Sequence, residues 1–242
     1  MPDKHQQIIK EAIDSFPVFA THLWHFLRLP SPTPVQYQLA DYLQNGPNRR
    51  IIMAYRGCGK SFLTAGYVLW RLRKNPDTKV LVISAAQDRA DAFSVFCHDL
   101  LRNWFMVKDL FPSDTQRFSK VAFDVYGSKP DQSPSVRSSG IFGQITGSRA
   151  DLIVADDVET PQSCETQLIR DKLRESIKEF DSIIKPGGQI VFLGTPHTQD
   201  SIYGKLELAG YTPRIWTALY LSLIHISEPT RPLYISYAVF CL

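Results

Sequence analysis

One short segment carries the residue types that bind phosphate groups: Ala54-Tyr55-Arg56-Gly57-Cys58-Gly59-Lys60-Ser61. Gly57 and Gly59 let the backbone turn tightly, so that its N–H groups can point at an anion. Lys60 can reach β- and γ-phosphates as a mobile charge, and the hydroxyl of Ser61 is a ligand for Mg²⁺. An apolar run precedes the segment and a helical pattern follows it, which is the strand, loop and helix context of a phosphate-binding loop.

The segment departs from the general pattern G-x-x-x-x-G-K-[ST] at its first position, where Ala54 replaces the first glycine. We expect nucleotide contacts from all eight residues, 54 to 61. Arg56 can place a guanidinium beside the γ-phosphate, where it would stabilise charge in the transition state. The alternatives are an ordinary glycine-rich turn for the segment and a solvated loop charge for Arg56.

A second segment delivers carboxylates: Asp151-Leu152-Ile153-Val154-Ala155-Asp156-Asp157-Val158-Glu159. Four apolar residues that run directly into acids are typical of a buried strand that presents carboxylates to a Mg²⁺–nucleotide, the Walker B arrangement. We expect Asp156 to hold Mg²⁺ through water and Asp157 to orient or activate the attacking water, with Glu159 as the alternative. A strand that ends in a solvated acidic turn is the competing interpretation, and the phosphate loop upstream makes it the weaker one.

Two more polar positions are candidates for the same site. Pro32-Thr33-x-x-Gln36 resembles the adenine-reading Q motif of helicase-like ATPases, since a glutamine amide can both donate to and accept from the adenine edge. A surface glutamine on an amphipathic helix is an equal alternative. Further along, residues 189–196 read as a buried strand ending at Gly194-Thr195, where Thr195 could sense the γ-phosphate; a plain strand-ending turn is the alternative.

The segments between these motifs predict an α/β fold with a central, mainly parallel sheet flanked by helices. Apolar spacing predicts helices over residues 6–29 (broken at Pro17), 36–43, 62–72, 89–101, 166–183 and 203–208. Strands are expected at 51–53, 79–85, 151–155, 189–196 and, more weakly, at 118–126 and 211–220. The Ser- and Pro-rich stretch 128–140 is expected to be a loop, and 186–188 (Pro-Gly-Gly) is expected to end the helix before it.

Composition places the chain among ordinary globular proteins. Its 242 residues are 44% hydrophobic and carry a net charge of +3, which by itself does not establish nucleic-acid binding. The four cysteines have no metal-like spacing and indicate free thiols in a reducing cytoplasm. The N-terminus is too polar for a secretory signal, and no apolar run reaches membrane-spanning length.

Taken in order, four motifs stand in the chain: A-Y-R-G-C-G-K-S, V-L-V-I-S-A, T-G-S-R-A-D-L-I-V-A-D-D-V-E and I-V-F-L-G-T-P. In order and spacing they closely resemble the ATPase domain of the large terminase subunit of tailed bacteriophages, most of all the short-tailed type that packages DNA from concatemers. The resemblance runs from about Phe16 to Tyr220. A loop with arginine in its middle and alanine at its start is characteristic of that family, which implies a RecA-like P-loop NTPase fold.

The resemblance implies a motor that assembles as a homo-oligomeric ring on the portal protein of a procapsid. It would hydrolyse ATP with Mg²⁺ to move double-stranded DNA inward, with the small terminase subunit as a further partner, in the host cytoplasm and without a membrane. A helicase-like nucleic-acid-dependent ATPase and a nucleotide-binding module with little activity are the alternatives. Replacing Asp156 and Asp157 by asparagine would separate hydrolysis from binding.

The resemblance also assigns roles to residues. Lys60 and Ser61 would bind nucleotide and Mg²⁺, Arg56 would act in cis, and Gly194 and Thr195 would belong to the motif that couples hydrolysis to movement, with the pair Asp156 and Asp157 as Walker B carboxylates. Such rings use an arginine from the neighbouring subunit as well, and Arg149 is the first candidate and Arg137 the second. Either arginine could instead contact the DNA backbone or form a structural ion pair.

Three segments are expected along the chain: a helical lead-in with the adenine-motif region over 1–50, the P-loop ATPase core over 51–220, and a tail over 221–242. The tail resembles translated read-through of a sequencing-library adapter; a genuine apolar C-terminal segment is the alternative. Family members carry a second, ribonuclease-H-like nuclease domain with clustered acids. We do not expect it in this chain, because Glu228 is the sole acid after Tyr220.

Overall fold

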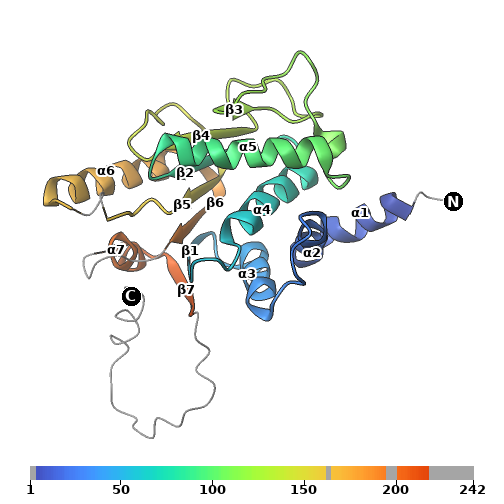
Figure 1. The fold of residues 1–242 in the computed structure, drawn as a ribbon. Coiled ribbons are helices and arrows are strands. Elements are labelled where there is room, and N and C mark those ends of the chain that lie inside the picture. Colours follow the sequence, from blue (N-terminus) through green and yellow to red (C-terminus); the bar gives the residue numbers. More distant parts are fainter. Residues whose placement is uncertain (1–3, 162–164, 195–200, 218–242) are drawn as a thin grey trace, which may run out of the picture.

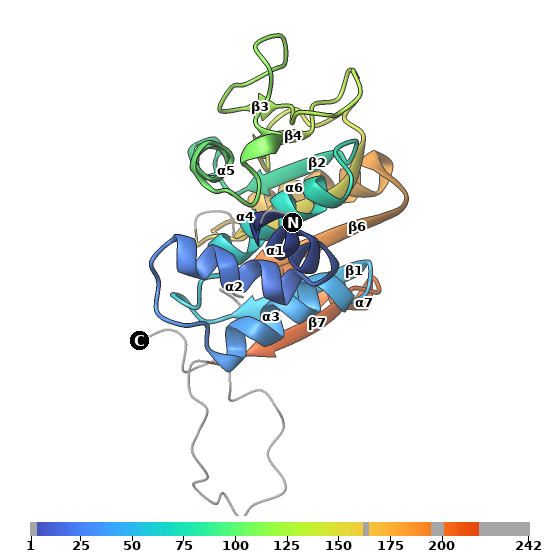
Figure 2. The ribbon, with the colours of Figure 1, turned by 90° about the vertical axis from the view of Figure 1, so that its right-hand side faces the viewer.

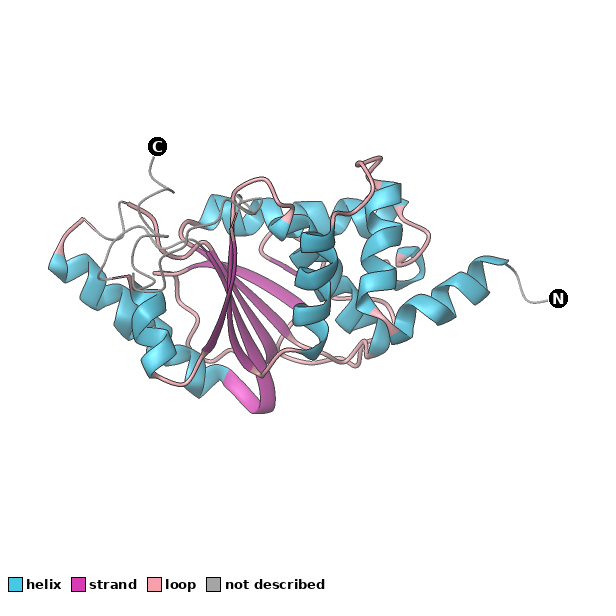
Figure 3. Ribbon diagram, turned by 90° about the horizontal axis from the view of Figure 1, so that it is seen from below, coloured by secondary structure: helices cyan, strands magenta, loops and turns pink. Residues whose placement is uncertain are grey.

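A seven-stranded sheet runs through the centre of the molecule, with helices on both of its faces (Figures 1 and 3). The computed structural model describes residues 4–161, 165–194 and 201–217. The strand order is β3-β4-β2-β5-β6-β1-β7, and every neighbouring pair in it is parallel except β3 with β4. The strands are β1 Arg49–Ala54, β2 Val80–Ser84, β3 Ala122–Phe123, β4 Val136–Gly140, β5 Ala150–Asp156, β6 Ile184–Gly194 and β7 Thr212–Trp216.

The helices form two outer layers. One layer holds α1 Lys4–Asp14, α2 Phe16–Phe26, α3 Pro34–Asn45, α4 Lys60–Lys74 and α5 Gln87–Asn103, followed by the short 3₁₀ helix η1 Lys108–Leu110. The other layer holds α6 Gln167–Ile183 and α7 Ile202–Leu208. None of the helices in the described ranges combines the length and the apolar character needed to cross a bilayer.

Alternation along the central strands builds one hydrophobic core on each face of the sheet. In β1, Ile52 and Ala54 join the core under α1 to α5, whereas Ile51 and Met53 join the core under α6 and α7. Strands β2, β5 and β6 divide their apolar residues in the same way. These strands are therefore buried on both sides, which is why they read as continuous apolar runs in the sequence.

The N-terminal helices belong to the larger of these cores. Phe16 of α2 packs its ring against Tyr67 and Trp70 of α4, with ring centroids 5.2 and 5.5 Å apart, and Figure 2 shows α1, α2 and α3 gathered on that side of the sheet. The expected break at Pro17 is confirmed: α1 ends at Asp14, and the proline occupies the first turn of α2, where a missing N–H costs nothing. The boundary expected at residue 50 falls inside β1.

Three predicted elements differ in the structure. Residues 136–140, expected within a loop, form β4. The sequence shows no apolar run there, because the buried residues include Ser138 and Ser139, whose hydroxyls are hydrogen-bonded. The strand expected over 118–126 is limited to β3. The Pro-Gly-Gly stretch 186–188 lies within β6, since α6 already ends at Ile183 and the strand begins at the next residue. The tail 221–242 and Thr195 lie outside the described residues.

Strand register decides where the predicted motifs meet. Ser84 of β2 pairs with Asp156 of β5, and Asp156 pairs with Leu193 of β6. The next residue of β6, Gly194, pairs with Met53 of β1. Because these strands are parallel, their carboxyl ends form one edge of the sheet, where ligand-binding loops of open α/β sheets lie.

Candidate nucleotide-binding site

The glycine-rich loop joins the end of β1 at Ala54 to the start of α4 at Lys60. Gly57 and Gly59 both adopt φ of +84°, a left-handed conformation that side chains disfavour. A Cβ atom on Gly59 would also lie 2.8 Å from Cζ2 of Trp24. The loop therefore needs glycine at residue 59 both for its backbone and for the close approach of the tryptophan ring.

Lys60 folds back into its own loop. Its Nζ donates a short hydrogen bond to the carbonyl of Ala54 and another, of 3.2 Å, to the carbonyl of Tyr55. The ammonium group thus lies within the turn that the sequence predicts as a phosphate cradle. An incoming phosphate would compete with these two carbonyls for the charge. Ser61 follows at the first turn of α4 and is exposed.

Cys58 faces inward from the loop and is buried, and burial raises the pKa of its thiol above the ordinary value. The thiol therefore stays protonated at neutral pH. Its neighbour Arg56 is exposed at the tip of the loop.

Gln36 connects the start of α3 to the loop through both ends of its amide. Nε2 donates to the carbonyl of Cys58 at 3.0 Å, while Oε1 accepts from the backbone N–H of Thr33 at 2.7 Å. The second bond is half of a capping box at the start of α3. An adenine that binds Gln36, as the sequence predicts, would have to share or replace these bonds.

The two central carboxylates follow each other at the end of β5. Asp156 is the last residue of the strand, and Asp157 turns the chain with φ of +46° while its N–H donates to the carbonyl of Leu193 at 2.8 Å. Burial, followed by the charge of Asp157, raises the pKa of Asp156 to about 7, against the opposing charges of Lys60 and Arg89. Non-glycine residues at positive φ concentrate at functional sites.

The raised pKa gives a prediction for the metal-free protein. The pKa of Asp156 rises from 3.8 to about 7 on folding, so the folded state binds more protons between these values and stability falls as pH rises through that window. Asp156→Asn removes the charge. We expect this variant to melt higher than the parent at pH 8, on the order of 5 °C, with the difference shrinking towards pH 4. Thermal melts in the presence of a chelator measure this difference. The control Asp114→Asn, at an exposed residue, should change the melting temperature little. Equal melting temperatures of Asp156→Asn and the parent at pH 8 would contradict the prediction.

Glu159, the alternative to Asp157, has a buried carboxylate that fixes the start of α7. Its Oε2 accepts from the hydroxyl of Ser201 at 3.0 Å and from the N–H of Ile202 at 2.6 Å, and the residue is only 2% exposed. This oxygen is thus already engaged in holding a helix against the acidic strand end.

Removing the Glu159 side chain should destabilise the protein. Glu159→Ala leaves the hydroxyl of Ser201 and the N–H of Ile202 buried without an acceptor, which we expect to cost about 2–3 kcal/mol in urea unfolding. Ser201→Ala should cost less, and the double variant should lose less than the two single losses added together, because both remove one contact. Strictly additive losses would show that Glu159 and Ser201 do not stabilise each other.

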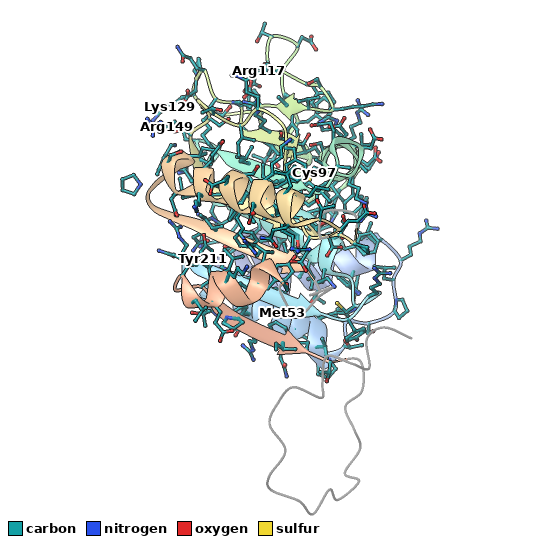
Figure 4. The ribbon with its side chains drawn as sticks, turned by 90° about the vertical axis from the view of Figure 1, so that its left-hand side faces the viewer. Met53, Cys97, Arg117, Lys129, Arg149 and Tyr211 are labelled. Atoms are coloured by element: carbon teal, nitrogen blue, oxygen red, sulfur yellow. The ribbon has the colours of Figure 1, made fainter. Side chains whose placement is uncertain are left out.

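The two arginines expected to serve a neighbouring subunit lie at the other edge of the sheet. Arg149 directly precedes β5 and donates to the carbonyl of Ser182 at 3.4 Å; in Figure 4 it lies well away from Met53 of β1. Arg137 is the second residue of β4. A strand rises ~3.3 Å per residue, so the length of β5 separates Arg149 from Asp156 by roughly 20 Å.

Two aromatic residues support the site in ways the sequence did not indicate. Trp24 of α2 packs against Gly59 of the loop, and Tyr203 of α7 lies so close to Gly194 that a Cβ there would be 1.8 Å from its hydroxyl. Both are buried. Each contact joins residues that are distant in the chain, so no local sequence pattern predicts it.

No family model matches the chain. In sequence it is 43% identical over 222 residues to the large terminase subunit of Enterobacteria phage T3, a match that covers 90% of this chain and 38% of that protein. The chain thus spans well under half of its relative's length.

Solved structures confirm the fold class. The large terminase of bacteriophage HK97 superposes with a TM-score of 0.54 at 14% identity, over 91% of this chain and 45% of that one. The DEAD-box helicase Mss116 gives a TM-score of 0.57 at 13% identity, over 89% and 45%. Both likenesses support a RecA-like α/β domain. By sequence, the chain is a relative of the large terminase subunit of Enterobacteria phage T3.

Proposed function

We propose that this chain is the ATPase motor domain of a DNA-packaging terminase, which couples ATP hydrolysis to translocation of double-stranded DNA into a procapsid. The observation that supports this most is the meeting of two motifs. The loop that carries Lys60 and the carboxylates Asp156 and Asp157 lie at the carboxyl edge of one sheet, in a chain 43% identical to a large terminase. Its working unit would be the core 51–220 together with the lead-in 1–50.

The residues present fit a Mg²⁺–nucleotide. The loop offers backbone N–H groups and the start of α4, where a helix attracts anions, and Lys60 would exchange its two carbonyls for β- and γ-phosphates. The hydroxyl of Ser61 and the carboxylate of Asp156 are the hard oxygen ligands that Mg²⁺ prefers. Mg²⁺ takes few protein ligands beside phosphates and water, so it does not require a cluster of three or more metal-binding side chains, and the described residues contain none. The ion would neutralise charge on the phosphates.

Around the phosphates, each remaining side chain would have one task. Asp157 would orient the attacking water and accept its proton, and Arg56 would add positive charge from the same chain. Gln36 would contact the adenine. Gly194 and Thr195 would couple ATP hydrolysis to movement of the DNA. An arginine would come from the neighbouring copy, Arg149 first and Arg137 second, a role supported by their distance from the site of their own chain.

In this proposal the partners are duplex DNA, the portal protein of the procapsid, the small terminase subunit and further copies of the chain in a ring. The place of work is the host cytoplasm, at the portal during packaging.

The test is the rate of ATP hydrolysis by the full chain with Mg²⁺, measured with and without duplex DNA. We expect hydrolysis that duplex DNA stimulates. Stimulation by single-stranded nucleic acid alone would favour a helicase-like ATPase instead. Tight ATP binding without turnover under either condition would mark a nucleotide-binding module. A thermal melt of the same sample establishes that the chain is folded in each measurement.

A further inference from the structure

A basic cavity of about 550 Å³ opens at the sheet edge opposite the glycine-rich loop. Positive side chains line it from four separate segments, at the amino ends of neighbouring strands. They are Lys79 just before β2, Arg137 of β4, Arg149 just before β5 and Lys185 of β6. The acidic lining residue is Asp131.

Three of the four cations have no carboxylate partner among the described residues. Arg137 donates to the hydroxyl of Ser148 and the carbonyl of Gln144, both at 2.9 Å, and Arg149 donates to a carbonyl. Lys185 differs, because its ammonium pairs with Asp151 at 2.9 Å. The cavity is therefore positive after its internal pairing is counted.

Lys79 is the strongest sign of a built site. The residue is only 4% exposed, yet its ammonium group makes no hydrogen bond or ion pair with any residue that the structure describes. Its backbone is fixed, since its N–H donates to the carboxylate of Asp151 at 2.8 Å. An anion that enters the cavity would therefore gain a charge-assisted contact with this largely buried side chain.

Asp131 shows that these charges act within the cavity. A hydrogen bond from the N–H of Ser133 holds the pKa of its carboxyl below the ordinary value, and the positive charges of Lys79 and Lys185 act in the same direction. Asp131 is exposed to solvent and makes no ion pair with Lys79, so it does not neutralise the ammonium as a buried ion pair would.

We propose that this cavity is a second phosphate site, which binds the compact polyphosphate chain of a nucleotide. Its volume lies in the range of small-molecule pockets, and a narrow polyphosphate can reach a recessed lysine that the phosphates of a continuous duplex, lying on the surface, cannot. The ligand is either a free nucleotide or a nucleotide presented by a neighbouring copy. As a site for free nucleotide it goes beyond the proposed motor function; as a site for a neighbour's nucleotide it rests on that function, in which Arg149 and Arg137 serve the neighbouring copy.

The test removes the loop site first. The full chain carrying Lys60→Ala is titrated with inorganic tripolyphosphate by calorimetry, and we expect one site to remain. In that background, Lys79→Gln or Arg137→Gln should weaken binding at least about tenfold, as expected for the loss of one charge-assisted contact. Asp131→Asn should tighten binding, which a merely structural role would not produce. Lys178→Gln, an exposed charge on α6, is the matched control.

Loss of all binding in Lys60→Ala, or equal weakening by Lys178→Gln, would overturn the proposal. The proposal would also be overturned if a DNA duplex displaced tripolyphosphate and if Lys79→Gln weakened duplex binding more than tripolyphosphate binding. Sedimentation with a non-hydrolysable ATP analogue identifies the source: association lost in Lys79→Gln indicates a nucleotide on a neighbour, and binding without association indicates free nucleotide. Failure of the motor function would leave tripolyphosphate binding in Lys60→Ala intact, so the two hypotheses fail separately.

Discussion

Replacing Lys60 by alanine is expected to weaken ATP binding by ~100-fold or more and to abolish hydrolysis. In the structure the ammonium of Lys60 already lies in the turn of the loop, hydrogen-bonded to the carbonyls of Ala54 and Tyr55. With nucleotide bound, the same charge would make two charge-assisted bonds to phosphate oxygens, each contributing about 1.5–3 kcal/mol. Alanine supplies neither bond and no charge, so both binding and turnover lose the contribution.

Two measurements separate this effect from unfolding. ATP affinity is measured by equilibrium titration and hydrolysis by phosphate release, each beside a thermal melt. Lys74→Ala is the matched control, since Lys74 ends the same helix α4 with its ammonium over the Trp70 ring and contacts no part of the loop. Hydrolysis at the parental rate in folded Lys60→Ala would mean that the loop is not the nucleotide site.

The central strands and the loop were predictable because their signals are local. A buried parallel strand appears in the sequence as an apolar run, and the residue types of the two motifs at the ends of β1 and β5 indicate phosphate and Mg²⁺ binding. Strand β4 was missed because two of its buried residues are serines, Ser138 and Ser139, whose hydroxyls form hydrogen bonds instead of packing as apolar side chains. Arg50 escaped for the same reason: it is 0% exposed in β1, and its guanidinium donates to the carbonyls of Leu43 and Gly46 at 2.8 Å. Because arginine is charged, the sequence did not indicate that Arg50 is buried in the core.

The candidate site divides in the same way. Lys60, Asp156 and Asp157 lie at one sheet edge, as their motifs predict, although their roles stay predictions. Glu159 was recognised as an acid, but its partners, Ser201 and Ile202, lie more than forty residues further along the chain. The basic cavity exists only because β4, β2, β5 and β6 are neighbours in the sheet, and that order is a tertiary property.

Asp157→Asn is expected to reduce hydrolysis by about 10²–10⁴-fold, the usual contribution of a general base, while ATP affinity stays within about threefold of the parent. Asparagine tolerates positive φ as aspartate does, so it can keep the +46° conformation and the hydrogen bond from the residue 157 N–H to Leu193. The amide still orients water by hydrogen bonding but accepts no proton. The substitution therefore removes the proton acceptor while the backbone conformation at residue 157 is kept.

Single-turnover hydrolysis and ATP titration on the same preparation decide this prediction, because they separate chemistry from binding and product release. Glu159→Gln is the informative comparison. Its amide oxygen can still accept from Ser201 and Ile202, so α7 stays in place while the carboxylate is lost. Hydrolysis that survives in Asp157→Asn but disappears in Glu159→Gln would transfer the water-activating role to Glu159. The buried bonds of Glu159 argue for the opposite result, since its Oε2 already accepts two hydrogen bonds that hold the start of α7.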